Sequence, residues 1–222
     1  MFSPFGGNIC DFFSISLSGV ILTLAGISGC LEAGARGLHF LGWGLAVLYL
    51  VSLWRNPGEP ALPWRQAVVL AGTLLFCFIL TLGMRFTVDD DYVYWGILPR
   101  YLAFFNHLPD PDTTIIRQHL AYTPGTSLIH YLVFRTTGSY GISLSYFAQT
   151  LILIAPLFSI FARESLKKGT LLTGLVVLIL VGFFGSVFTK LQVDYLLAVW
   201  FYVMLWIVYT QGLSPGTVAR LG

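Results

Sequence analysis

Three adjacent carboxylates, Asp89, Asp90 and Asp91, follow a long apolar run in the segment RFTVDDDYVYWG. Like charges this close repel one another, which is expected to raise the pKa of at least one carboxyl group into the range where it accepts a proton near neutral pH. Such a cluster also suits a metal ion or another cation. The alternative, common for charge runs, is a solvated loop end that only holds the preceding apolar segment in register.

Side chains suited to a membrane surface and to a phosphate follow these carboxylates. Tyr94 and Trp95 are amphipathic rings of the kind found where membrane meets water. Arg100 comes shortly afterwards, and its guanidinium can bind a phosphate through two parallel hydrogen bonds. The segment therefore combines a candidate proton acceptor with a candidate phosphate ligand.

A further carboxylate, Asp194, opens the last apolar run, in TKLQVDYLLAVWFYVM. A carboxylate beside so many apolar residues is costly unless water or a partner solvates it, which makes it a functional candidate. Lys190 is the simplest partner, although an exposed pair at this i, i+4 spacing contributes only roughly a few tenths of a kcal/mol. Structural pairing and function are equal alternatives for Asp194.

The remaining polar residues are weaker candidates. Arg117 is suited to an anionic headgroup or simply to solvent, and His119 lies near it. Neither His107 nor His119 has a second histidine or a carboxylate at the spacing of a preformed zinc site. His39 and His130 interrupt apolar stretches and are more simply explained as hydrogen-bonded helix residues.

The composition indicates whether these residues lie in a soluble or a membrane protein. Of 222 residues, 56% are hydrophobic and only 10% are charged, and the mean hydropathy is +0.80. A soluble domain carries roughly 25% charged residues, so we expect an integral membrane protein. The net charge of +2 is too small for a nucleic-acid-binding surface. Sequence motifs of serine hydrolases, NTPases and dinucleotide-binding enzymes are absent.

The apolar runs predict an all-α, polytopic bundle of about six transmembrane helices in a single membrane domain, residues 1–222. A spanning helix needs about 20 mostly apolar residues. The N-terminus lacks a basic stretch and a cleavage site, so the first run is expected to remain as an anchor. The predicted spans are residues 12–30, 38–54, 67–84, 142–162, 169–188 and 195–210.

Residues 85–141 form a long polar connection between the third and fourth spans. Apolar residues at helical spacing predict a short interfacial helix over residues 92–105. A second apolar stretch, residues 126–134, is too short to cross and is expected to be interfacial or re-entrant. The basic residues of the short loops 55–66 and 163–168 then lie on one side, which the positive-inside rule makes cytoplasmic. Both termini share that side, and residues 85–141 and 189–194 lie outside.

The order of these features resembles the membrane part of GT-C glycosyltransferases, which use polyprenyl-phosphate-linked sugars. The resemblance covers residues 67–210: Asp90 and Asp91 match the acidic motif of the first outer loop, Thr123-Pro124-Gly125 matches a PPG motif, and Asp194 matches a second acidic position. Thr123 replaces the first proline of that motif. Residues 1–66 would be two additional N-terminal spans, and the family's later spans would be missing, so a second polypeptide could complete the fold.

The resemblance implies a site for sugar transfer at the extracytoplasmic face, in a bacterial inner membrane. Asp90 or Asp91 would be the base, and Asp194 would hold a metal or position the acceptor. Substrate contacts would come from Arg100, Tyr94, Trp95, Arg117, His119 and Lys190, and a divalent cation, Mg²⁺ or Mn²⁺, would bind Asp91 and Asp194. The alternative is a non-catalytic membrane subunit or a small transporter. If the site exists, Asp194 is expected within about 10 Å of Asp90 or Asp91, the usual range for paired carboxylates that flank a sugar.

Overall fold

The computed structural model describes residues 7–55, 64–86, 95–110, 124–161, 168, 171, 174–175, 178, 191 and 194–211. Every regular element within these residues is a helix, which confirms the predicted all-α class for this part of the chain. The helices are α1 (Gly7–Ile27), α2 (Leu31–Arg55), α3 (Trp64–Thr81), α4 (Ile97–Phe105), α5 (Gly125–Thr137), α6 (Ile142–Phe161) and α8 (Asp194–Gln211).

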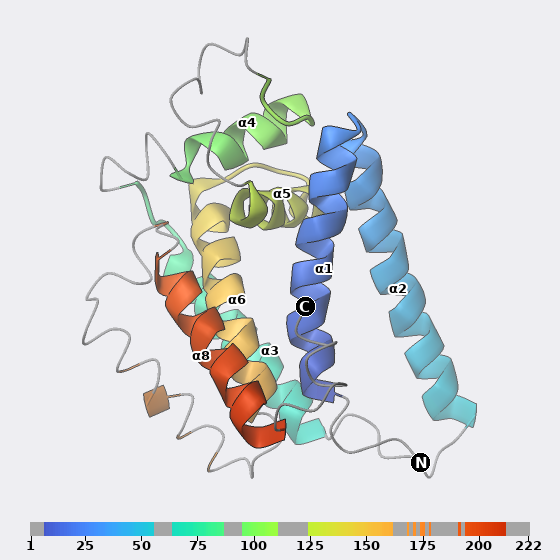
Figure 1. Cartoon of the computed structure of the whole chain (residues 1–222), viewed down its shortest axis with the longest axis vertical. Helices are drawn as coiled ribbons and strands as arrows, with labels where there is room; N and C mark the ends of the chain where they lie inside the picture. Colours follow the sequence, from blue (N-terminus) through green and yellow to red (C-terminus); the bar gives the residue numbers. More distant parts are fainter. Residues whose placement is uncertain are drawn as a thin grey trace.

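Five of these helices run along a common direction, and two lie across one end of them (Figure 1). The long helices are α1, α2, α3, α6 and α8, and the crossing helices are α4 and α5. We call the end covered by α4 and α5 the crosswise end. Helices α1 and α3 run toward it, whereas α2, α6 and α8 run away from it. The end of α3 and the start of α8 therefore share the crosswise end.

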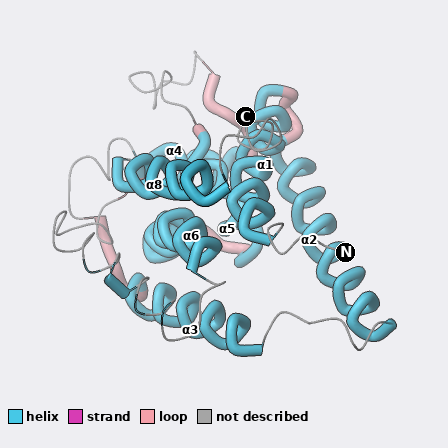
Figure 2. The backbone as a smooth tube through the Cα atoms, turned by 60° about the horizontal axis from the view of Figure 1, so that its bottom comes forward, coloured by secondary structure: helices cyan, strands magenta, loops and turns pink. Residues whose placement is uncertain are grey.

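Helix α6 is the central element of the described structure. It packs against α1, α3, α5 and α8, and Figure 2 shows it in the middle of the long helices. Its first half carries the buried polar side chains of Ser145, Gln149 and Thr150, whereas the sequence from Leu151 to Phe158 is apolar. Helix α2 is peripheral and packs only against α1 and α5 among the main helix contacts.

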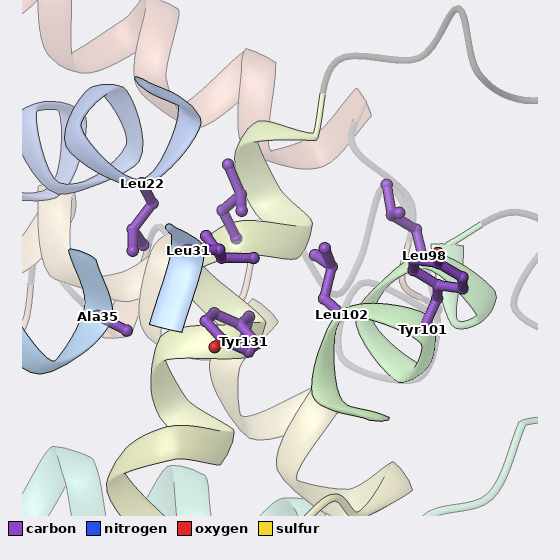
Figure 3. Packing of buried hydrophobic residues seen from close by; sticks show 8 residues of the cluster. Leu22, Leu31, Ala35, Leu98, Tyr101, Leu102 and Tyr131 are labelled. Carbon is purple, nitrogen blue, oxygen red and sulfur yellow. The ribbon is translucent and has the colours of Figure 1, made fainter. Parts of the chain in front are cut away.

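A cluster of buried side chains joins the first helical hairpin to the two crossing helices (Figure 3). Leu102 of α4 and Leu128 and Tyr131 of α5 are completely buried against Leu22 of α1 and Leu31 of α2. Ala35, Leu98 and Tyr101 complete this cluster. Burial of these side chains holds α4 and α5 across the end of α1 and α2, since each large apolar side chain contributes roughly 2 kcal/mol when removed from water.

A tight turn joins α1 to α2. Gly29 has a φ of +70°, a left-handed conformation that favours glycine. Beyond the turn, a Cβ on Gly34 would lie 2.5 Å from the Cβ of Ala25. The two helices therefore approach closely through small residues, as helices commonly do in membranes.

The second helix begins seven residues before the predicted boundary at residue 38. The predicted start was wrong, because the helix already begins at Leu31 and includes the charged residues Glu32 and Arg36. In the structure these two side chains pair at i, i+4, and Arg135 of α5 pairs with the same carboxylate. Charges in the first two turns are tolerated because they compensate one another, and Glu32 also suits a helix N-terminus.

The other predicted elements differ from the observed ones mainly at their ends. Residues 126–134 belong to α5, which lies across the bundle as an interfacial helix would. Helix α4 covers the last nine residues of the predicted helix 92–105, of which residues 92–94 lie outside the described part of the chain. Most of the predicted span 169–188 lies outside the described residues.

Within the part of the chain that the structure describes, one helix is long and apolar enough, by length and composition, to cross a membrane: Leu31–Ser52 within α2. Four further apolar stretches among the described residues are shorter, namely Ser14–Ile27, Ala71–Thr81, Ile142–Leu157 and Leu196–Leu205. The arrangement of six transmembrane helices therefore remains a prediction.

A proline inside α6 is compensated by a side chain from α8. Pro156 has no N–H, so the carbonyl of Ile152, four residues earlier, lacks its usual helical donor. The indole Nε1–H of Trp200 donates to this carbonyl at 3.2 Å. This hydrogen bond links α6 and α8 at the level of Ile152 and Trp200.

Replacing Trp200 with phenylalanine should therefore destabilise the protein in a way that depends on Pro156. We expect Trp200→Phe to lower the free energy of unfolding by about 1 kcal/mol, because a buried carbonyl loses its donor. In a Pro156→Ala background the helical donor is restored, so the same change should cost measurably less. Reversible unfolding of the four proteins in detergent measures this coupling, and equal costs in both backgrounds would contradict the compensation.

Candidate functional site

The end of α3 and the start of α6 are tied together at the crosswise end. The hydroxyl of Tyr146 donates to the backbone carbonyl of Arg85 at 3.3 Å. The ring of Tyr146 also lies edge-on to Phe86, with 6.1 Å between the ring centroids. Phe78 of α3 makes a similar edge-on contact with Phe147 of α6, with 5.6 Å between the ring centroids. Arg85, four residues before the acidic triplet, is thus positioned by α6.

Asp194 lies at the same height along the bundle as this contact. Trp200 and Ile152 are level because they share a hydrogen bond. Asp194 precedes Trp200 by six residues on α8, and Tyr146 precedes Ile152 by six residues on α6. Six residues correspond to about 9 Å along a helix. Since α6 and α8 run in the same direction (Figure 1), both displacements point to the crosswise end. Asp194, which is exposed, is therefore level with Tyr146 and hence with the carbonyl of Arg85.

Several predicted site residues lie outside the described part of the chain. They are Asp90, Asp91, Tyr94, Arg117, His119 and Lys190. The approach of Asp194 to Asp90 or Asp91 within about 10 Å therefore remains a prediction. Two neighbouring residues are described: Arg85, which lies level with Asp194 through the hydrogen bonds given above, and Trp95, which lies two residues before the start of α4.

Arg100 and Trp95 belong to the α4 region. Trp95 is partly buried just before the helix, and Arg100 is exposed on it. The Arg100 guanidinium lies 6.0 Å from the centroid of the Phe104 ring, near the outer limit for a cation–π contact. Burial raises the pKa of the nearby Tyr140 hydroxyl, and the positive charge of Arg100 partly opposes this shift. Arg100 is thus accessible to an anion at the surface of α4.

A buried histidine, His130 of α5, faces the polar half of α6. Its Nε2 lies 3.2 Å from Oε1 of Gln149, and both side chains are almost fully buried. Its Nδ1 has no hydrogen-bond partner among the described residues. Burial lowers the pKa of His130 to about 4, against a smaller opposing effect of the hydrogen bond to Gln149. His130 is therefore neutral at physiological pH. The predicted hydrogen bond of this helix histidine is present at Nε2 but not at Nδ1.

The sequence analysis missed an ion cluster between α2 and α5. Oε1 of Glu32 accepts from Nη2 of Arg36 at 2.6 Å and from Nη2 of Arg135. The spacing of Glu32 and Arg36 was a usable signal for a helical pair. Arg135 lies 103 residues from Glu32, so nothing local indicated its participation.

The predicted divalent cation is not supported by the described residues themselves. Among them, no group of three or more histidine, cysteine, aspartate or glutamate side chains is placed to hold a metal. Asp194 supplies one carboxylate, and a Mg²⁺ site commonly uses one or two together with substrate phosphates. The other predicted metal ligand, Asp91, lies outside the described residues, so the metal site remains a prediction.

The buried His130 should make stability depend on pH. The unfolded chain takes up a proton near pH 6.5, whereas the folded protein keeps His130 neutral down to about pH 4. Protonation therefore favours unfolding as the pH falls from 6.5 toward 4. We expect the free energy of unfolding to drop by up to roughly 3 kcal/mol over this range, and His130 to have no effect above about pH 7.

Thermal unfolding in detergent at several pH values measures this effect. The His130→Asn variant is the control, because an amide does not titrate and can still hydrogen-bond to Gln149. Identical pH dependence of the two proteins would show that His130 is not held neutral by the fold.

Comparison with known proteins does not assign this chain to a family. No family model, curated protein or solved structure matches it.

Proposed function

We propose that the chain is a multi-pass integral membrane protein with six spans. The main support is the apolar surface of its long helices. Large apolar side chains are exposed along α2, α3 and α8, with Phe40 at 77%, Trp43 at 73% and Phe76 at 62%. Contiguous apolar surfaces of this extent are rare on soluble monomers, and lipid would cover them.

The distribution of charge supports the same proposal. Described charged side chains gather at the crosswise end, including Glu32, Arg36, Arg100, Arg135 and Asp194. Arg55 ends α2 at the opposite end. Between the two ends the long helices present apolar side chains, as a hydrocarbon layer requires. In this proposal the crosswise end is extracytoplasmic, both termini are cytoplasmic, and the membrane is a bacterial inner membrane.

Labelling of single cysteines tests the proposed topology. In a background without the native cysteines, Thr137→Cys at the end of α5 should react with a membrane-impermeant maleimide added to intact cells. Ser165→Cys should react only after the cells are opened. Reaction of Ser165→Cys in intact cells, with Thr137→Cys protected, would contradict the proposed sidedness.

We propose further that the crosswise end is the site of a GT-C-like glycosyltransferase. The observation that carries this proposal is that Asp194 lies level with Arg85, the residue four positions before the acidic triplet. Two acidic motifs far apart in the sequence would then act at one membrane surface. The crossing helices α4 and α5 would cover the site, and the apolar flanks of the bundle would accept a polyprenyl chain.

The proposed reaction transfers a sugar from a polyprenyl phosphate to an acceptor hydroxyl. Asp90 or Asp91 would take the hydroxyl proton while the oxygen attacks the anomeric carbon with inversion. The bond between that carbon and the phosphate oxygen would break, and the phosphate would leave with the electron pair. Arg100 would stabilise the charge on the phosphate, and Asp194 would position the acceptor. A divalent cation held by Asp91 and Asp194 would add positive charge beside the phosphate.

A non-catalytic membrane subunit is the second candidate. Residues 40–52 of α2 are exposed wherever the structure describes their side chains, which leaves a helix face to which a second polypeptide could bind. A subunit of this kind would also contain membrane helices but would not transfer sugar. Activity of the purified chain therefore distinguishes the two candidates.

Donor binding provides a sharper test of the site. Arg100→Ala should raise the Kd for a polyprenyl-phosphate analogue by roughly ten-fold or more, because a charge-assisted hydrogen bond to phosphate is lost. Arg117→Ala is the matched control and should have a much smaller effect. Isothermal titration of the protein in nanodiscs measures both.

The two outcomes have different consequences. Equal effects of the two substitutions would remove Arg100 from the site. If the protein binds the analogue but transfers no sugar from any polyprenyl-phosphate donor tested, the subunit proposal replaces the enzyme proposal.

A further inference from the structure

The ion cluster of Glu32, Arg36 and Arg135 carries an excess of positive charge. Both arginines donate to the same carboxylate oxygen, so two guanidinium groups lie side by side against one negative charge. The cluster therefore has a net charge of +1. The side chain of Arg36 is 65% exposed, compared with 30% for Arg135 and 35% for Glu32. A guanidinium carries five N–H donors, so the two arginines can donate hydrogen bonds to a further acceptor that reaches the cluster from outside.

This cluster occupies the corner between two helices. Arg135 ends α5, which lies across the bundle, and Arg36 is in the second turn of α2, which runs away from that end (Figure 1). A second contact closes the corner, since Nε2 of His39 lies 2.6 Å from Oγ1 of Thr136. The charged groups are thus held by both helices, and their position does not depend on one flexible side chain.

An exposed apolar strip on α2 continues from the charged corner. Phe40, Trp43 and Val47 follow Arg36 at spacings of four, seven and eleven residues, which places all of them on one helical face. They are 77%, 73% and 55% exposed. Helix α5 covers this face of α2 only near its start, through Glu32 and His39. The strip therefore leads from the cations at the crosswise end toward the middle of the bundle.

We propose that this corner binds an anionic phospholipid. The phosphate would accept hydrogen bonds from Arg36 and Arg135, and an acyl chain would lie along Phe40, Trp43 and Val47. The order of the parts matches such a lipid, because the charge is at the membrane surface and the apolar strip extends inward from it. A free phosphate would use the cations but not the strip. The inference rests on the proposed membrane embedding, and it is independent of sugar transfer.

The experiment compares lipid binding by the full chain and by two matched arginine variants. Native mass spectrometry or thermophoresis in a neutral detergent would titrate phosphatidylglycerol, with phosphatidylcholine as the zwitterionic lipid. We expect Arg36→Gln to raise the Kd for phosphatidylglycerol by roughly ten-fold, because a hydrogen bond between charged groups is lost. Arg55→Gln removes the same charge from the other end of α2 and should leave the Kd unchanged.

Arg36→Gln leaves the pair of Arg135 with Glu32 in place, so the fold should persist, and the melting temperature without lipid checks this. Equal Kd values for the native protein and Arg36→Gln would overturn the proposal. So would equal loss of affinity in Arg36→Gln and Arg55→Gln. Displacement of the lipid by glycerol 3-phosphate at similar concentration would identify a free phosphate as the ligand and would also overturn it.

Failure of this site is distinguishable from failure of the proposed function. Cysteine labelling reports on membrane embedding whether or not a lipid binds at Arg36. Phe40→Ala gives an independent measure of the apolar strip: it should weaken binding of phosphatidylglycerol and leave the weak binding of glycerol 3-phosphate unchanged. An unchanged affinity for the lipid in this variant would exclude the strip from the site.

Discussion

Helix α5 is the constraint on which the described structure depends, because it lies across the end of the helices that it joins. Tyr131 and Leu128 are buried against the first helical hairpin. Arg135 pairs with Glu32 of α2, and His130 hydrogen-bonds to Gln149 of α6. The hydroxyl of Tyr131 also donates to Asn106, at the end of α4, at 2.9 Å. A short helix thereby determines how four other helices meet.

Polar groups along the long helices are satisfied within the helices themselves. The hydroxyls of Ser18, Thr23, Thr81 and Thr150 each donate to the carbonyl four residues earlier. Such local hydrogen bonds are of little use on a water-exposed surface, where solvent supplies partners, but they are needed in an apolar environment. The donation from Trp200 to the carbonyl freed by Pro156 follows the same requirement.

The crosswise end differs from the rest of the molecule in its chemistry. The ion cluster, the buried histidine and the exposed Asp194 all lie there, whereas the flanks of α2, α3 and α8 are apolar. A site at this end would have ionic groups beside lipid-facing surfaces. That combination suits ligands with a charged head and an apolar tail, and it underlies both the proposed donor and the proposed phospholipid.

Composition and periodicity were sufficient to predict the helical class and most of the helices, because each depends on apolar side chains close together in the sequence. They also predicted that residues 126–134 would not cross with the long helices. The charged start of α2 was missed. The i, i+4 spacing of Glu32 and Arg36 is compatible with a helical pair, but Arg135, which pairs with the same carboxylate, is 103 residues away and no local pattern indicates it.

The candidate site was likewise predicted only in part from the sequence. The sequence alone identified Asp194 and Arg100 by residue type and by the apolar runs beside them. Only the tertiary structure placed Asp194 level with Arg85, through two hydrogen bonds that both end on α6. It also paired His130 with Gln149 and joined two arginines on one glutamate. These contacts are decided by how helices pack, and packing depends on residues distant in sequence, which no local pattern encodes.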